Sequence, residues 1–176
     1  VMERQLLIDE IKKGFVLGNK FFERDVLAPQ TEKLNIQGYE FTGYQARIDD
    51  MKSYFDENMK LLKDGNLDSL FLGNPIYTKV RDDNPTRYIN GSKAKNVMVA
   101  DGCVIEGEIE NSILFRGVKV AKGAKVKNCI LMQDTVIEAG AEIEYVVSDK
   151  YVTVSEGKQL KGTDSFPVFI AKDQVV

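Results

Sequence analysis

The chain has 176 residues, a formal net charge of −3 and no histidine. It is long enough for one compact domain or two small ones, and its slight negative charge excludes a basic surface for nucleic acid or an anionic membrane. Without histidine it can form neither a Ser–His–Asp or Cys–His triad nor an imidazole metal site. No apolar run reaches the ~20 residues that span a bilayer and no signal-peptide pattern opens the chain, so we expect a cytoplasmic protein. Val1 is not a start residue and opens directly into a helical pattern, so we expect a piece of a longer protein.

The first forty residues predict helices followed by a short strand pair. Apolar residues at helical spacing indicate a first helix from Met2 to Gly14. A second, shorter helix over residues 21–27 ends before a proline, which biases the preceding residue out of the α region. Apolar residues on both sides of Gly38 then predict a strand pair over residues 34–41.

The strongest helical pattern in the chain follows two adjacent aspartates. Asp49 or Asp50 can cap the helix, and the apolar residues of segment 51–62 keep to one face before Asp64 and Gly65 end it. Such a stripe usually packs into a core, and capping is a more economical role for the aspartates than acid–base chemistry.

Four segments after Gly91 share the pattern aliphatic-x-x-Gly-x-x-aliphatic. Their glycines are 21, 17 and 17 residues apart, and Asn111-Ser-Ile-Leu114 is echoed 17 residues later by Asn128-Cys-Ile-Leu131. Two markers in step indicate a repeat array. The aliphatic anchors, expected in the core, are Val99 and Ile105, Val120 and Val126, Ile137 and Ile143, and Val154 and Leu160.

This spacing predicts three short strands per coil and about 17 or 18 residues per coil, with each coil stacked on the next. We therefore predict an α+β fragment followed by a left-handed parallel β-helix of the hexapeptide-repeat type. The expected divisions are 1–70 for the fragment, 71–95 for a linker rich in glycine and proline, and 96–176 for the β-helix. The longer first step predicts a loop at one corner around Glu106 to Ile109. Whether the isoleucine or the leucine of each Ile-Leu pair points inward stays open at this stage.

Two cysteines, Cys103 and Cys129, fall inside the array. Their separation of 26 residues fits no metal-site pattern, so we interpret them as buried fillers that stay reduced and unpaired.

Several motifs resemble those of the ADP-glucose pyrophosphorylases, also called glucose-1-phosphate adenylyltransferases. Asn111-Ser-Ile-Leu-Phe-Arg-Gly-Val-Lys-Val120 closely resembles a run in their β-helix. Pro75–Thr78 and Pro85–Tyr88 are similar to the linker before it, and Phe41–Tyr44 to the strand before the sugar-site motif. Arg24–Pro29 is a looser match. The resemblance extends over essentially the whole chain and implies that the family's glycine-rich nucleotide loop would lie upstream of it.

The resemblance also shows where this sequence departs from catalytic members. Their sugar-site motif reads Gly-Tyr-Trp-x-Asp-[Ile/Val]-Gly-Thr, and its aspartate helps to hold magnesium. Here Gln45 takes the place of the tryptophan and Arg47 that of the metal aspartate, while Glu23 replaces a glycine in the earlier motif. The degenerate motif comprises Gly43, Tyr44, Gln45, Arg47, Asp49 and Asp50.

The resemblance therefore implies a regulatory, non-catalytic subunit of glucose-1-phosphate adenylyltransferase in glycogen synthesis, with neither catalytic nor metal-binding residues in this chain. Expected partners are a catalytic homologous subunit, which would hold Mg²⁺, in a hetero- or homo-oligomer, and a small-molecule effector. Open coil ends and outward apolar residues such as Leu114 and Phe115 are expected to serve assembly. The alternatives are the tail of another sugar-nucleotide pyrophosphorylase or a stand-alone β-helix oligomerisation module. A hexapeptide acyltransferase is disfavoured because it needs a histidine base.

Overall fold

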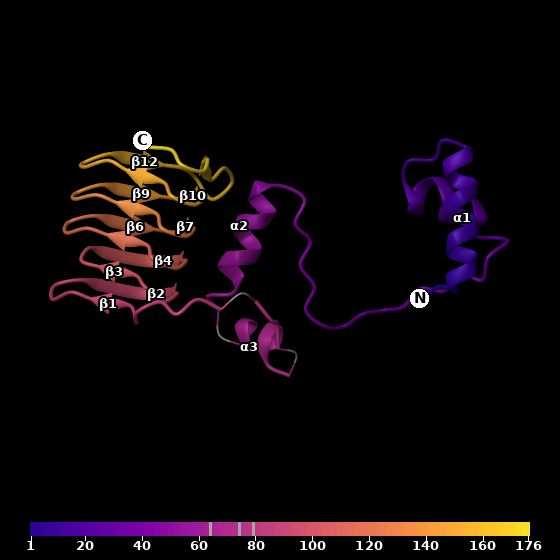
Figure 1. Cartoon of the computed structure of the whole chain (residues 1–176), viewed down its shortest axis with the longest axis horizontal. Helices are drawn as coiled ribbons and strands as arrows, with labels where there is room; N and C mark the ends of the chain where they lie inside the picture. The colour runs from indigo at the N-terminus through magenta and orange to yellow at the C-terminus, as the bar shows by residue number, and fades with distance from the viewer. Residues whose placement is uncertain (64, 74, 79) are drawn as a thin grey trace. The chain divides into compact units, whose positions relative to one another are not determined.

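The computed structural model describes residues 1–63, 65–73, 75–78 and 80–176 (Figure 1). The chain divides into two compact units, Val1–Gly43 and Tyr44–Val176. The first unit contains the helix α1 (Arg4–Val16), the π-helix η1 (Phe22–Leu27) and the 3₁₀ helix η2 (Ala28–Gln30).

The helices of the first unit lie where the apolar spacing predicts them. Gly14 is buried on α1, where an added Cβ would come within 3.4 Å of the Val26 side chain, so the two helices approach closely at this glycine. The strand pair predicted over residues 34–41 is wrong, because this segment contains no strand. Tyr39 and Phe41 are exposed there, and an isolated two-stranded hairpin without an apolar face to cover is at best marginally stable.

The second unit begins with the predicted capped helix. Helix α2 (Met51–Lys60) starts at Asp50 and is followed by the short helix α3 (Asn66–Phe71), which the sequence pattern did not indicate. Gly65 precedes α3 with a φ of +79°, a conformation that glycine adopts without strain. Asp64, the other residue expected to end α2, lies outside the described residues.

Parallel strands from Arg87 onward form stacked coils, seen edge-on in Figure 1. One sheet has the order β1-β3-β5-β8-β11 and the other β12-β9-β6-β4-β7-β10-β13, with β2 beside β4. The first strands lie within the segment expected to be linker. The strands are β1 (Arg87–Tyr88), β2 (Lys93–Val99), β3 (Val104–Ile105), β4 (Glu108–Leu114), β5 (Lys119–Val120), β6 (Lys125–Lys127), β7 (Ile130–Leu131), β8 (Val136–Ile137), β9 (Glu142–Glu144), β10 (Val146–Ser148), β11 (Thr153–Val154), β12 (Gln159–Lys161) and β13 (Val168–Ile170).

The aliphatic anchors stack in columns through the coils. Val120 pairs with Ile137 and Ile137 with Val154, so that each anchor lies over the equivalent one of the next coil. Parallel pairing at the ~4.8 Å strand spacing makes these columns continuous. Of the eight expected core positions, all contribute to one apolar cluster; Val99 and Leu160 are partly buried and the other six are at most 2% exposed.

The first repeat segment is out of register with the other three. Ile105 pairs with Val120, whereas Val99 pairs with Leu114, so the Val99 and Ile105 anchors belong to different columns from those that the glycine spacing suggests. The aligned glycines lie at different corners of the coil. Gly102 has the same sequence surroundings as Gly123 but not the same place in the fold.

The loop predicted around Glu106 to Ile109 is also wrong. Ile109 pairs with Val126, so the corner between Ile105 and Ile109 is two residues shorter than the equivalent corner of the next coil. Gly107 permits this short corner, because a Cβ at this position would lie 2.4 Å from the Ala124 carbonyl oxygen. The chain tucks in here instead of projecting.

One corner of the β-helix is built from asparagines in the left-handed region. Asn96, Asn111 and Asn128 have φ values of 50°, 45° and 50°, and the Asn96 side-chain amide donates to Asn111 Oδ1 at 2.8 Å. Asparagine tolerates this conformation better than most residues. Tyr145 occupies the same place in the next coil with a φ of 51°, although a bulky residue is unfavourable there.

The structure settles which member of each Ile-Leu pair points inward. Leu114 and Leu131 belong to the core of the coils, so the expectation that Leu114 is an outward residue is wrong. Phe115 is 40% exposed. Ile130 instead belongs to a second cluster outside the coil, together with Phe55 of α2. The outer surface of β7 and β10 is therefore covered by a helix.

Candidate functional site

The degenerate motif forms an exposed segment without helix or strand. Tyr44 is half-buried, and its hydroxyl donates to Glu57 Oε2 at 3.1 Å, which ties the segment to α2. The Arg47 Nε lies 2.7 Å from Asp49 Oδ2, with both side chains largely exposed. The guanidinium thus stands at the position of the family's metal aspartate and pairs with its own neighbour. Gln45 is exposed, and Gly43 closes the first compact unit.

Asp50 caps α2 and has a structural role. The Ser53 amide donates to Asp50 Oδ1 at 2.7 Å, and the Asp50 amide donates to Ser53 Oγ at 3.0 Å, which completes a capping box. The Ser53 amide is the main cause of the lowered pKa of Asp50, because a hydrogen bond to the carboxylate favours its charged form. Asp49 also donates its amide to the Ser53 hydroxyl.

The described part of the chain lacks the usual elements of an active site. It contains no group of three or more histidine, cysteine, aspartate or glutamate side chains that could hold a metal ion. Burial raises the pKa of Cys129 to about 12, so this thiol stays protonated and is a poor nucleophile. None of the helices in the same residues combines the length and the apolar character that crossing a bilayer requires.

The best-organised contact outside the coils is the junction between α2 and the β-helix. Phe55 is 3% exposed and packs with Ile130 and Val147. The rings of Phe55 and Tyr145 have centroids 6.0 Å apart at an angle of 49°. Such tilted ring pairs are favourable beyond the area that they bury. The sequence signal for Tyr145 was its place in the asparagine repeat, where a large residue is unusual.

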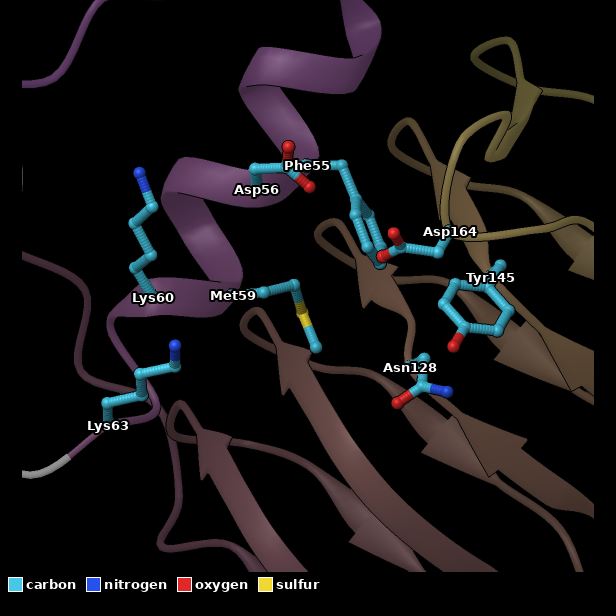
Figure 2. A pocket seen from close by; sticks show the side chains of 8 residues that line it. All are labelled: Phe55, Asp56, Met59, Lys60, Lys63, Asn128, Tyr145 and Asp164. Atoms are coloured by element: carbon cyan, nitrogen blue, oxygen red, sulfur yellow. The ribbon is translucent and has the colours of Figure 1, made fainter.

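A cavity of about 280 Å³ opens beside this junction (Figure 2). Phe55 and Met59 point from α2 toward the β-helix, and Asn128 and Tyr145 lie on the opposite side. The Lys60 ammonium is held by Glu57 at 2.6 Å. The cavity is lined by Phe55, Asp56, Met59, Lys60, Lys63, Asn128, Tyr145 and Asp164. Its apolar floor and mixed charged rim suit a small polar molecule with an apolar face.

Comparison with known proteins gives matches over almost all of this chain. Residues 79–165 match the family described as GlmU-like, C-terminal hexapeptide. The glycogen biosynthesis protein GlgD of Bacillus subtilis (strain 168) is 41% identical over 176 residues, covering 99% of this chain and 51% of the relative. GlgD of Geobacillus stearothermophilus is 53% identical over 70 residues, covering 39% of this chain and 20% of that protein. The glucose-1-phosphate adenylyltransferase of Clostridium perfringens (strain SM101 / Type A) is 29% identical over 172 residues, covering 89% of this chain and 44% of the enzyme.

The chain belongs to the family of GlgD and the glucose-1-phosphate adenylyltransferases. It is related to the C-terminal region of the adenylyltransferases, and its hexapeptide repeats form a left-handed parallel β-helix. The chain spans about half the length of the GlgD relative that it matches over its full extent. Over similar spans it is more similar to this GlgD than to the adenylyltransferase, at 41% against 29% identity.

Proposed function

We propose that this chain is part of a non-catalytic, regulatory subunit of glucose-1-phosphate adenylyltransferase that acts in glycogen synthesis in the cytoplasm. The complete enzyme would make ADP-glucose and pyrophosphate from ATP and glucose 1-phosphate. The observation that carries the proposal is Arg47, which stands where catalytic members have a metal-binding aspartate. The similarity to a protein named for glycogen biosynthesis supports the pathway.

Arg47 is incompatible with the metal chemistry of the family. Nucleotidyl transfer needs Mg²⁺ to neutralise phosphate charge, and a carboxylate is the natural ligand. A guanidinium stays protonated at any physiological pH and repels the cation. Asp49 does not replace the missing ligand, because it is paired with Arg47, and Asp50 is engaged in capping α2. The magnesium would therefore be held by a catalytic homologue.

On this proposal, the region serves assembly and effector response. Helix α2 joins the disarmed motif to the β-helix through Phe55, so a change at one can be transmitted to the other. The cavity beside Tyr145 is where a small-molecule effector would bind in this chain.

The test is to purify the full-length parent alone and together with its catalytic homologue, and to measure ADP-glucose formation by each. We expect negligible activity from the parent alone, and a mixed assembly whose turnover or effector response differs from that of the homologue. Strong activity of the parent alone would overturn the non-catalytic assignment, and failure to co-purify would remove the partnership. Replacing glucose 1-phosphate and ATP by other sugar phosphates and nucleotides in the mixed assay tests the alternative of another sugar-nucleotide pyrophosphorylase.

A further inference from the structure

One outer surface of the β-helix carries rows of charge whose sign alternates from coil to coil. The rows come from β2, β4, β6 and β9, which lie side by side in parallel register. In each row an inward aliphatic or alanine residue separates two outward charged residues, as alternation along a strand requires. We call this surface the charged face. Its rows are Lys93 and Lys95, Glu108 and Glu110, Lys125 and Lys127, and Glu142 and Glu144.

The ion pairs within the chain join the rows two by two. Lys93 and Lys95 contact the glutamates of the second row at 2.7 and 3.4 Å. The third and fourth rows are joined in the same way, with nitrogen–oxygen distances of 2.7 and 3.7 Å. These side chains remain 31–81% exposed, and exposed pairs contribute only about 0–1 kcal/mol each. The charges are therefore still hydrated and available to a second molecule.

The signs of the four rows, positive, negative, positive and negative, make the surface complementary to itself. A two-fold axis that lies in the plane of the face, along the strands and between the second and third rows, reverses the order of the rows. The first row then meets the partner's fourth row, and the second meets the partner's third, so every meeting joins opposite charges. Two-fold symmetric interfaces require this kind of self-complementarity.

We propose that the charged face is a self-association surface that binds the same face of a second copy with the coil axes antiparallel. The alternative two-fold axis, along the coil axis, would place each row over the identical row and bring like charges together. A groove of about 310 Å³ between the charged columns, with Ile109 and Val126 at its floor, gives room for the partner's side chains. This property belongs to the chain alone and does not rest on the proposed regulatory function.

Charge rows of this kind give a weak association that depends on salt. Screening shortens the range of exposed charges from about 10 Å at 0.1 M salt to about 3 Å at 1 M. Sedimentation equilibrium of the 176-residue chain should therefore show dimers at about 0.05 M NaCl, and a dissociation constant at least tenfold higher at about 0.5 M. A chain that stays monomeric at low salt, or a dimer that is insensitive to salt, would overturn the proposal.

Cross-linking between single-cysteine variants tests the arrangement itself. In the antiparallel dimer, Glu110 of one copy meets the partner copy's third row at the position of Lys127. A mixture of Glu110→Cys and Lys127→Cys chains should then form disulfide-linked dimers, which neither variant forms by itself. A mixture of Glu108→Cys and Glu110→Cys chains is the matched control, because these positions meet only in the parallel arrangement. Cross-links in the control mixture, and none in the first, would refute the antiparallel dimer. The buried Cys103 and Cys129 stay out of the reaction.

Discussion

Replacing Phe55 by alanine should release α2 from the β-helix without unfolding the coils. Burying a phenylalanine side chain contributes about 1.5–3 kcal/mol, and an aromatic pair such as Phe55 with Tyr145 adds about 0.5–1.5 kcal/mol. The substitution should therefore cost the docked state about 2–4 kcal/mol, which is roughly a 30- to 1,000-fold change in the ratio of docked to undocked helix. With 10 residues, α2 is too short to remain helical alone. The coils should survive because their core lies inside them.

Hydrogen exchange read by mass spectrometry is the direct assay for this prediction. Peptides from α2 should lose their protection in Phe55→Ala, whereas peptides from β5, β6 and β8 should keep theirs. The matched control is Phe166→Ala, the same chemical change at a phenylalanine that is 78% exposed, which should leave α2 protected. Loss of protection throughout the coils, or unchanged protection of α2, would refute the account of the junction.

Three further predictions concern the coils and the helix cap. Val126→Asp should destabilise the β-helix severely in thermal melts, because it places an unpaired charge in a dry column, while Val80→Asp, at an exposed position, should change little. A thiol reagent should find Cys103 and Cys129 unreactive in the native chain and should count both in denaturant; a count of zero would contradict the free thiols. Asp50→Ala should cost about 1 kcal/mol of α2 stability, seen as faster amide exchange in its first turn, since it removes the cap; unchanged exchange would show that the cap contributes nothing.

The sequence predicts the β-helix well because its periodic signal and its core are the same thing. Each aliphatic anchor, such as Val120 or Ile137, lies over its repeat, so a spacing of 17 residues translates directly into stacked coils. The error at the first repeat has a physical cause. Gly102 and Gly123 both adopt positive φ, but at different corners, and residue type alone does not tell one left-handed corner from another.

The α2 junction was only half visible in the sequence. The apolar stripe of α2 indicated that Phe55 is buried, but not what covers it. The isoleucine of the Ile-Leu pairs gave the missing half, since an aliphatic residue on the outer side of a strand needs a cover; yet local sequence does not decide which neighbour of a pair faces out. The predicted strand pair over residues 34–41 failed for the opposite reason. Its pattern is suitable, but no apolar surface lies there to pack it.

The alternating rows of charge also bear on how the chain finds its own fold. A stack of similar coils can mispair during folding, because every coil offers the same aliphatic column to its neighbours, and repeat proteins are prone to such misassembly. A chain that skipped one coil would lay Lys93 and Lys95 beside Lys125 and Lys127, and directly opposed like charges are destabilising. The signs thus label odd and even coils, and they penalise a slip of one coil even though the apolar column does not detect it.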